Sequence, residues 1–115
     1  WGDGEQTRSF MYIDDCITGM DLMWKLGDSS PLNLGSDQMV SINQLVDVAE
    51  NIAGVKLKRN YNLDAPQGVR GRNSENTMIK KKLGWAPQIT LEEGLEKTYR
   101  WIHDQIIDPG ASNGF

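Results

Sequence analysis

The segments of this chain that favour β-structure are all short, and this limits what the chain can fold into more than any other feature. Extended segments are predicted at residues 10–13, 31–34, 39–40 and 56–61. Strands this short form a stable sheet only when other elements pack against it. We therefore predict a mixed α+β piece of an α/β protein. It would be a subdomain that packs against protein structure outside this chain.

Four helices are predicted with more detail, because their ends carry recognisable capping residues. Ser41 is followed three residues later by Gln44, and Thr90 by Glu93, which is the pattern of a capping box. The expected ends are Asp14 and Gly27 for the first helix, Ser41 and Gly54 for the second, Thr77 and Leu83 for the third, and Thr90 for the start of the fourth.

The loop at residues 62–76 is long for so small a domain, and loops of this length are usually functional or disordered. It contains Gly68 and Gly71, which allow close approach of the backbone to a ligand. We expect one domain over residues 1–108 and a flexible tail over residues 109–115. The opening at Trp1, without an initiator methionine, favours a piece of a longer protein.

Charge and composition exclude some classes of partner. The 12 Lys and Arg residues are outnumbered by 16 Asp and Glu residues, whereas nucleic-acid binding needs clustered basic residues. No apolar run approaches 18 residues, so no membrane span is expected, and no signal peptide is visible. Cys16 is the only cysteine, which rules out an internal disulfide and fits a reducing, cytoplasmic setting.

Three arginines are the candidate binding residues of this acidic chain. Arg8 follows Gln6-Thr7, and Arg70 and Arg72 lie one residue apart in the glycine-flanked loop, beside Asn73. Guanidinium groups bind phosphate oxygens in a bidentate manner and keep their charge at any relevant pH. The residues alone leave two readings open, a phosphate-binding loop or a solvated loop with incidental charge.

Motifs for catalysis and for dinucleotide binding are missing from the sequence. There is no G-x-G-x-x-G motif, and no tyrosine is followed four residues later by lysine. His103 is the only histidine, lies far from Cys16, and has no partner at metal-ligand spacing. We therefore predict no catalytic or metal-binding residue in this chain, and a structural role for His103.

Several motifs resemble those of the extended short-chain dehydrogenases, the NAD-dependent epimerase/dehydratase family. They are Trp1-Gly-Asp-Gly-Glu-Gln-Thr-Arg-Ser-Phe10, Tyr12-Ile-Asp-Asp15, Pro31-Leu-Asn-Leu-Gly-Ser36, Ser41-Ile-Asn-Gln-Leu45, Lys80-Lys-Lys-Leu-Gly-Trp-Ala-Pro87 and Thr90-Leu-Glu-Glu-Gly-Leu95. The resemblance implies that this chain is the C-terminal, substrate-binding subdomain of such an enzyme. It also implies that the Rossmann core, which holds NAD, belongs to an N-terminal domain absent from this chain.

The segment Gly68-Val-Arg-Gly-Arg-Asn-Ser-Glu-Asn76 resembles the branch of this family that epimerises GDP-mannose at carbons 3 and 5 after transient oxidation at carbon 4. The resemblance implies a GDP-sugar substrate whose diphosphate is gripped by Arg72 and Arg8. Arg70 and Asn73 are weaker candidates beside them. Family members are often dimers, so a homodimer of the full-length protein is compatible with the resemblance.

Other readings remain open at this stage. One is a related enzyme, such as a UDP- or dTDP-sugar 4-epimerase or 4,6-dehydratase. Another is a nucleotide-sugar binding module without catalysis, which the missing catalytic motifs would allow. A third is a structural or interaction domain in which the arginine loop is incidental.

Overall fold

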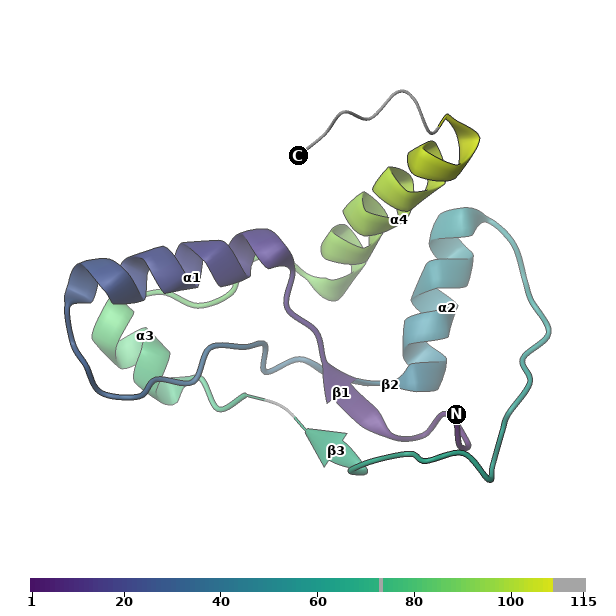
Figure 1. Cartoon of the computed structure of the whole chain (residues 1–115), viewed down its shortest axis with the longest axis horizontal. Helices are drawn as coiled ribbons and strands as arrows, with labels where there is room; N and C mark the ends of the chain where they lie inside the picture. The colour runs from purple at the N-terminus through teal and green to yellow at the C-terminus, as the bar shows by residue number, and fades with distance from the viewer. Residues whose placement is uncertain (73, 109–115) are drawn as a thin grey trace.

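Four helices lie beside and above a small sheet in which segments far apart in the sequence meet, and no described helix lies below β3 in the view of Figure 1. A computed structural model describes residues 1–72 and 74–108. Its elements are β1 (Thr7–Ser9), α1 (Ile13–Leu26), β2 (Met39–Ser41), α2 (Ile42–Ala53), β3 (Gly71–Arg72), α3 (Thr77–Leu83) and α4 (Leu91–Ile107). The predicted mixed α/β class is confirmed. The tail at residues 109–115, predicted to be flexible, lies outside the described residues.

The sheet has the order β2-β1-β3, with β1 antiparallel to β2 and parallel to β3. Arg8 of β1 is the register partner of both Val40 of β2 and Arg72 of β3. Because paired residues in adjacent strands project to the same face, these three side chains share one face of the sheet. Gly71 lies on the other face, where an added Cβ would stand only 2.8 Å from Thr7 Oγ1, so β3 can approach β1 this closely only with glycine there.

The predicted helix ends are largely confirmed. The Ser41 side chain accepts from the Gln44 N–H while the Gln44 side chain accepts from the Ser41 N–H, which completes the capping box of α2. Gly27 ends α1 in the left-handed conformation that was expected of it. The N-cap of α1 is Tyr12, so the prediction of Asp14 was wrong; Asp14 lies in the first turn, where a carboxylate favours the helix dipole.

The predicted strands are mostly wrong. Residues 31–34 and 56–61 form no strand, and β1 ends before residues 10–13, where α1 already begins. Only the prediction at residues 39–40 is confirmed, by β2. Strand β3 lies inside the segment predicted as a loop. Strand formation depends on neighbouring strands to pair and pack with, and the segments at residues 31–34 and 56–61 have no such partner among the described residues.

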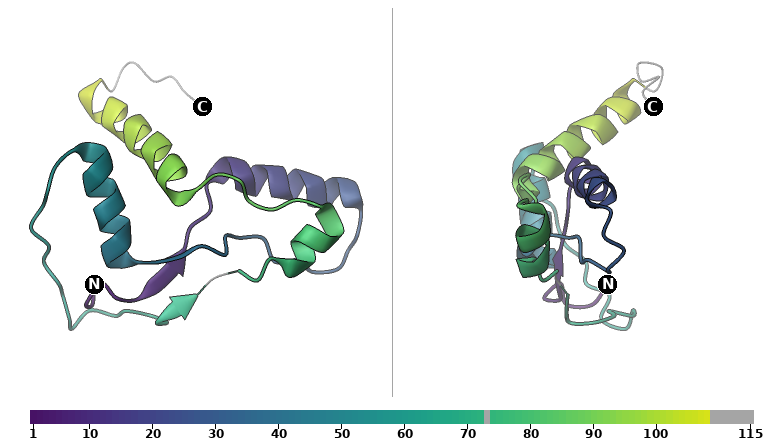
Figure 2. Two further views of the ribbon diagram at one scale, coloured as in Figure 1. Left: turned by 180° about the vertical axis from the view of Figure 1, so that it is seen from behind. Right: turned by 90° about the vertical axis from the view of Figure 1, so that its left-hand side faces the viewer.

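The molecule is a thin slab, with extents of 47 × 39 × 21 Å (Figure 2). Helix α1 packs on α3, and α2 packs on α4. Asp15 joins α1 to the segment between α3 and α4: its buried carboxylate accepts through Oδ2 from the N–H groups of Gln88 (3.0 Å) and Ile89 (2.8 Å). Ile79 of α3 is the one hydrophobic residue that is buried among the residues described. None of the described helices combines the length and apolar content needed to cross a membrane.

Candidate functional site

Arg8 and Arg72 stand side by side on one face of the sheet although 64 positions separate them in the sequence. They are register partners in the parallel β1–β3 pair. Adjacent strands lie about 4.8 Å apart, so the two side chains leave the sheet as immediate neighbours. Two guanidinium groups starting this close together are well placed to bind the two phosphates of one diphosphate.

The Arg8 side chain is held in place by backbone carbonyls. Its Nη1 donates to the Thr7 carbonyl at 2.7 Å, and its Nη2 donates to the Gln67 carbonyl at 3.2 Å. No acidic side chain among residues 1–72 and 74–108 forms an ion pair with it. These two bonds use two of the five N–H donors of the guanidinium, which leaves an oriented and uncompensated cation with donors to spare.

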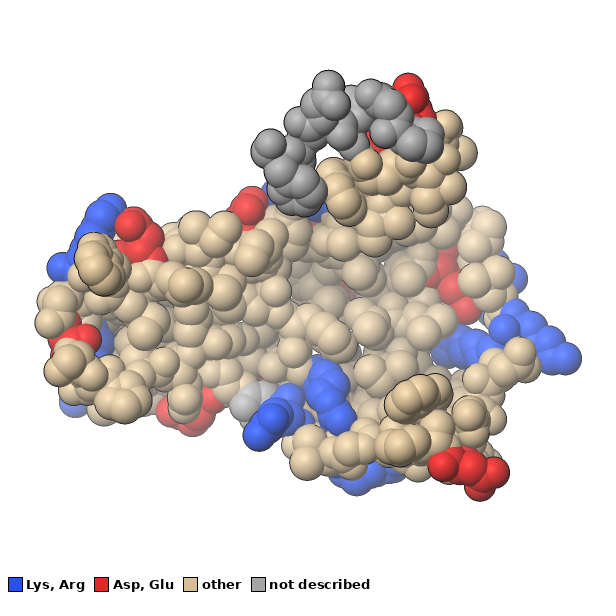
Figure 3. Space-filling model, viewed as in Figure 1, with Lys and Arg blue, Asp and Glu red and all other residues tan. Residues whose placement is uncertain are grey.

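The Arg72 side chain is exposed, and within the described part of the chain it forms neither a hydrogen bond nor an ion pair. Figure 3 shows basic side chains over the β1–β3 region, with no acidic side chain between them. Like charges placed together repel each other, and an anion bound between them would relieve that repulsion. The arrangement therefore favours a doubly charged ligand.

Arg70 is placed differently from the other two arginines. Its Nη1 lies 3.0 Å from Asp3 Oδ1, and the same nitrogen donates to Gln67 Oε1 at 3.2 Å. Its charge is therefore already paired, and it joins the 67–72 loop to the N-terminal turn. The fourth candidate, Asn73, lies outside the described residues.

The contact between Asp3 and Arg70 should be measurable as a change in the pKa of Asp3. The Glu5 N–H and the Arg70 guanidinium both donate to its carboxylate, and they lower its pKa below 3.8. A lowered pKa means that the contacts stabilise the fold at neutral pH and that this contribution is lost as pH falls through the lowered value. We expect carboxyl NMR titration to place the Asp3 pKa below 3.8. In Arg70→Ala it should move back toward 3.8; an unchanged value would show that the ion pair does not form in solution.

The N-terminal turn positions β1 against the loop. The Gly2 N–H donates to the Asn62 carbonyl, and the Thr7 N–H donates to the Arg70 carbonyl, both at 2.7 Å. Gly4 has a φ of 76°, and a Cβ there would collide with the Asn43 side chain. Nothing in the sequence indicated that Asp3 or Gln67 supports the arginines. Only the Gly-Asp-Gly pattern around Asp3, which predicts a tight turn, hinted at a constrained segment.

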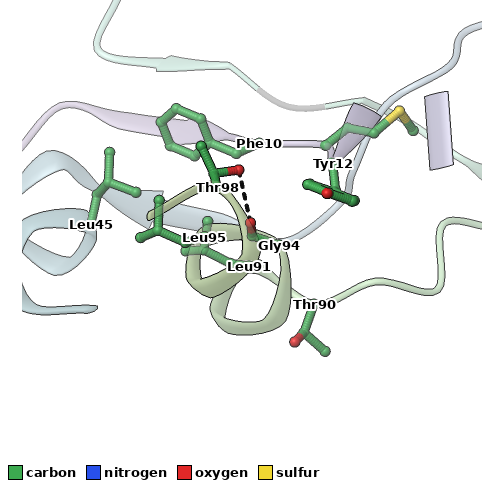
Figure 4. Close-up of a pocket in the computed structure, with 9 residues that line it drawn as sticks. Phe10, Tyr12, Leu45, Thr90, Leu91, Gly94, Leu95 and Thr98 are labelled. Atoms are coloured by element: carbon green, nitrogen blue, oxygen red, sulfur yellow. Dashed lines mark hydrogen bonds between the residues drawn. The ribbon is translucent and has the colours of Figure 1, made fainter. Parts of the chain in front are cut away.

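A separate pocket of about 270 Å³ lies between the β1–α1 connection, α2 and α4 (Figure 4). Its lining includes Phe10, Tyr12, Leu45, Leu91, Leu95 and Thr98. The polar hydroxyl of Thr98 is already used, since it donates to the Gly94 carbonyl at 2.9 Å. No charged side chain lines this pocket, so it does not suit a diphosphate.

The described residues do not fit a dinucleotide. Such a ligand needs a strand that runs into a helix through a glycine-rich turn, with free N–H groups facing the phosphates. Only β2 runs directly into a helix within the described chain, and there Ser41 caps α2 with its own side chain. The described part of the chain also holds no group of three or more His, Cys, Asp or Glu side chains placed to bind a metal ion. His103 stacks on Tyr99, with ring centroids 5.9 Å apart.

Comparison with known proteins gives matches along most of the chain. The family model described as GDP-mannose 4,6 dehydratase matches residues 1–98. GDP-mannose 3,5-epimerase from Arabidopsis thaliana is 49% identical over 106 residues, which are 92% of this chain and 28% of that protein. These matches bear out the resemblance that the motifs had indicated.

Solved structures agree with the sequence matches. UDP-glucose 4-epimerase from Thermotoga maritima, solved with UDP-glucose, superposes with a TM-score of 0.86 and 32% identity over 92% of this chain and 34% of that one. UDP-glucuronic acid 4-epimerase from Bacillus cereus, solved with NAD, gives a TM-score of 0.81 and 27% identity over 96% of this chain and 34% of that one. The chain thus spans about a third of the length of its relatives. It belongs to the GDP-mannose 4,6 dehydratase family, among the extended short-chain dehydrogenases.

Proposed function

We propose that residues 1–108 are the C-terminal, substrate-binding part of an NAD-dependent nucleotide-sugar epimerase, and that Arg8 and Arg72 bind the diphosphate of its substrate. The observation that carries this proposal is their pairing across β1 and β3, without an acidic partner for either among the described residues. A nucleotide sugar supplies two adjacent phosphates, which match two adjacent guanidinium forks.

Each arginine has a distinct role in this proposal. Arg8 is oriented in advance by the Thr7 and Gln67 carbonyls, so little side-chain freedom is lost when a phosphate binds. Arg72 is exposed and becomes ordered on the ligand. Arg70 acts indirectly, because its pairing with Asp3 holds the loop that carries Arg72. For Asn73 we propose a contact with the same ligand, on the resemblance alone.

The whole protein is proposed to be a GDP-mannose 3,5-epimerase. The support is the 49% identity to the Arabidopsis thaliana enzyme of that name. Because the described residues offer no dinucleotide site, we place NAD and the groups that react with the sugar outside this chain, N-terminal to it. The runner-up is a UDP-sugar 4-epimerase, which the structural likeness to the Thermotoga maritima enzyme favours.

The test is a competition between bases in the full-length protein. We expect calorimetry to show GDP-mannose binding at least ten times more tightly than UDP-glucose, and NMR of the product mixture to show inversion at carbons 3 and 5. Binding and conversion of UDP-glucose alone would establish the 4-epimerase. Binding of GDP-mannose without conversion would indicate a binding module, and no binding of either would leave the arginines with a structural role.

A further inference from the structure

Three segments that are distant in the sequence meet at the start of α2. They are the turn at residues 2–5, the first turn of α2, and the segment that leads from α2 to β3 (Figure 1). Asn43, the second residue of α2, contacts both of the other segments. Its N–H donates to the Gly4 carbonyl at 2.9 Å, and its carbonyl accepts from Arg59 Nη1 at 3.4 Å. The backbone of Asn43 therefore already joins the three segments.

The Asn43 side chain adds three hydrogen bonds at this junction. Its Nδ2 donates to the Asp3 carbonyl at 3.3 Å and to Glu5 Oε1 at 2.5 Å, while its Oδ1 accepts from the Tyr61 hydroxyl at 2.9 Å. The orientation of the amide follows from these partners, because a carbonyl and a carboxylate only accept and so must face the amino group. One end of the amide thus holds the N-terminal turn, and the other end holds the segment before β3.

The Asn43 side chain is not needed to form α2. Ser41 and Gln44 already complete the capping box of this helix, and asparagine ranks low among helix-forming residues. A carboxylate would suit this position better than an amide, because it interacts favourably with the helix dipole in the first turn. The amide at position 43 is therefore explained by its partners outside the helix.

The segments that Asn43 joins are the ones that carry the proposed diphosphate site. Asp3, which Asn43 holds through its carbonyl, pairs with Arg70 at 3.0 Å. The Arg70 carbonyl in turn accepts from the Thr7 N–H at 2.7 Å, at the point where β1 and β3 begin to pair. A shift of the N-terminal turn would therefore move Arg72, and two guanidinium groups bind one diphosphate well only at a fixed spacing.

We propose that Asn43 is a positioning residue for diphosphate binding, which sets the placement of Arg72 beside Arg8 by acting through Asp3 and Arg70. This inference rests on the proposed function of the two arginines. Because the amide fixes both segments before a ligand arrives, less of the site has to become ordered on binding. The ligand class is a molecule with two adjacent phosphates, such as a nucleoside diphosphate sugar.

Asn43→Asp in the full-length protein separates positioning from a role within the helix. The substitution keeps the size of the side chain and the acceptor for Tyr61, but it replaces the donor that faces Asp3 and Glu5 by a charged acceptor. We expect the Kd for GDP-mannose, measured by calorimetry, to rise about ten-fold. In steady-state assays KM should rise while kcat changes by less than about two-fold, since ground-state binding is lost rather than chemistry.

Gln44→Glu is the matched control for the added charge. It places an equal charge one residue away in the same turn, keeps the capping box and leaves every contact of Asn43 in place, so Kd should not change. Tyr61→Phe removes only the hydrogen bond to Asn43 Oδ1 and should raise Kd less than Asn43→Asp does. If Asn43→Asp does not fold, Tyr61→Phe serves as the test variant.

Amide hydrogen exchange without ligand tests the positioning separately from binding. The Thr7 N–H should exchange faster in Asn43→Asp than in the wild type or Gln44→Glu, because its acceptor on Arg70 is held less firmly. Unchanged exchange at Thr7, an unchanged Kd, or an equal loss of binding in Gln44→Glu would each overturn the proposal. If the wild type binds no GDP-mannose, the proposed function fails, and the exchange at Thr7 alone decides whether Asn43 holds β1 and β3 together.

Discussion

Replacing Arg72 by alanine in the full-length protein is expected to weaken GDP-mannose binding by about 2–4 kcal/mol, which is roughly a 30- to 700-fold rise in Kd. The loss arises because Arg8 would remain alone against two phosphates, and one phosphate would lose its bidentate partner. Arg72→Lys keeps the charge but not the fork, so it should fall between the wild type and Arg72→Ala. Isothermal titration calorimetry gives the three Kd values directly.

Arg100 offers a matched control for this experiment. It is also an exposed arginine, but it lies on α4, where it pairs with Glu96 at 2.8 Å. Arg100→Ala removes the same charge and should leave Kd unchanged. Equal binding by wild type and Arg72→Ala would refute the diphosphate role. Arg8→Ala is a less clean test, since Arg8 also ties β1 to the Gln67 carbonyl.

Asp15→Ala is expected to lower the free energy of unfolding by about 3 kcal/mol, since it leaves the N–H groups of Gln88 and Ile89 without their acceptor. These hydrogen bonds hold the segment before α4 against α1. Their loss should therefore weaken the packing of the whole molecule. Asp15→Asn retains one acceptor oxygen and should cost less. Urea unfolding followed by circular dichroism measures the difference.

The adjacent Asp14 is the control for this stability effect. It is an exposed carboxylate in the same first turn of α1, so Asp14→Ala removes an equal charge and costs only the dipole interaction, about 0.5 kcal/mol. Equal effects of the two substitutions would mean that the carboxylate of Asp15 stabilises the helix rather than the contact with residues 88–89.

Helices were predictable because their ends depend on local chemistry. Ser41 and Gln44 complete a capping box through bonds that span three residues, and Gly27 ends α1 in a left-handed conformation with no atom within 4 Å of where a Cβ would stand. Helix α1 has a packed side near Gly19 and an exposed apolar side with Ile13, Ile17, Met20 and Trp24. This division depends on the elements packed against the helix, so local sequence does not predict it.

Strands and the site were harder to predict for the same physical reason. Strand β3 consists of Gly71 and Arg72, a polar pair with no apolar alternation, and it exists only because β1 lies beside it. The three arginines could be named from their type and their glycine-rich surroundings. The sequence spacing does not show that Arg8 and Arg72 are neighbours or that Arg70 pairs with Asp3. Both arrangements follow from pairing between segments that are distant in the sequence.

The parallel pairing of β1 with β3 also sets an order of events during synthesis. Arg8 and Arg72 are 64 positions apart, so at 5–20 residues per second the second arginine leaves the ribosome roughly 3–13 seconds after the first. The residues of helices α1 and α2 have been synthesised by then, and β1 can already pair with β2. The pairing of Arg8 with Arg72 is therefore the last feature of the sheet to form, and the proposed diphosphate site is complete only after the segment at residues 62–72 has packed against the N-terminal turn.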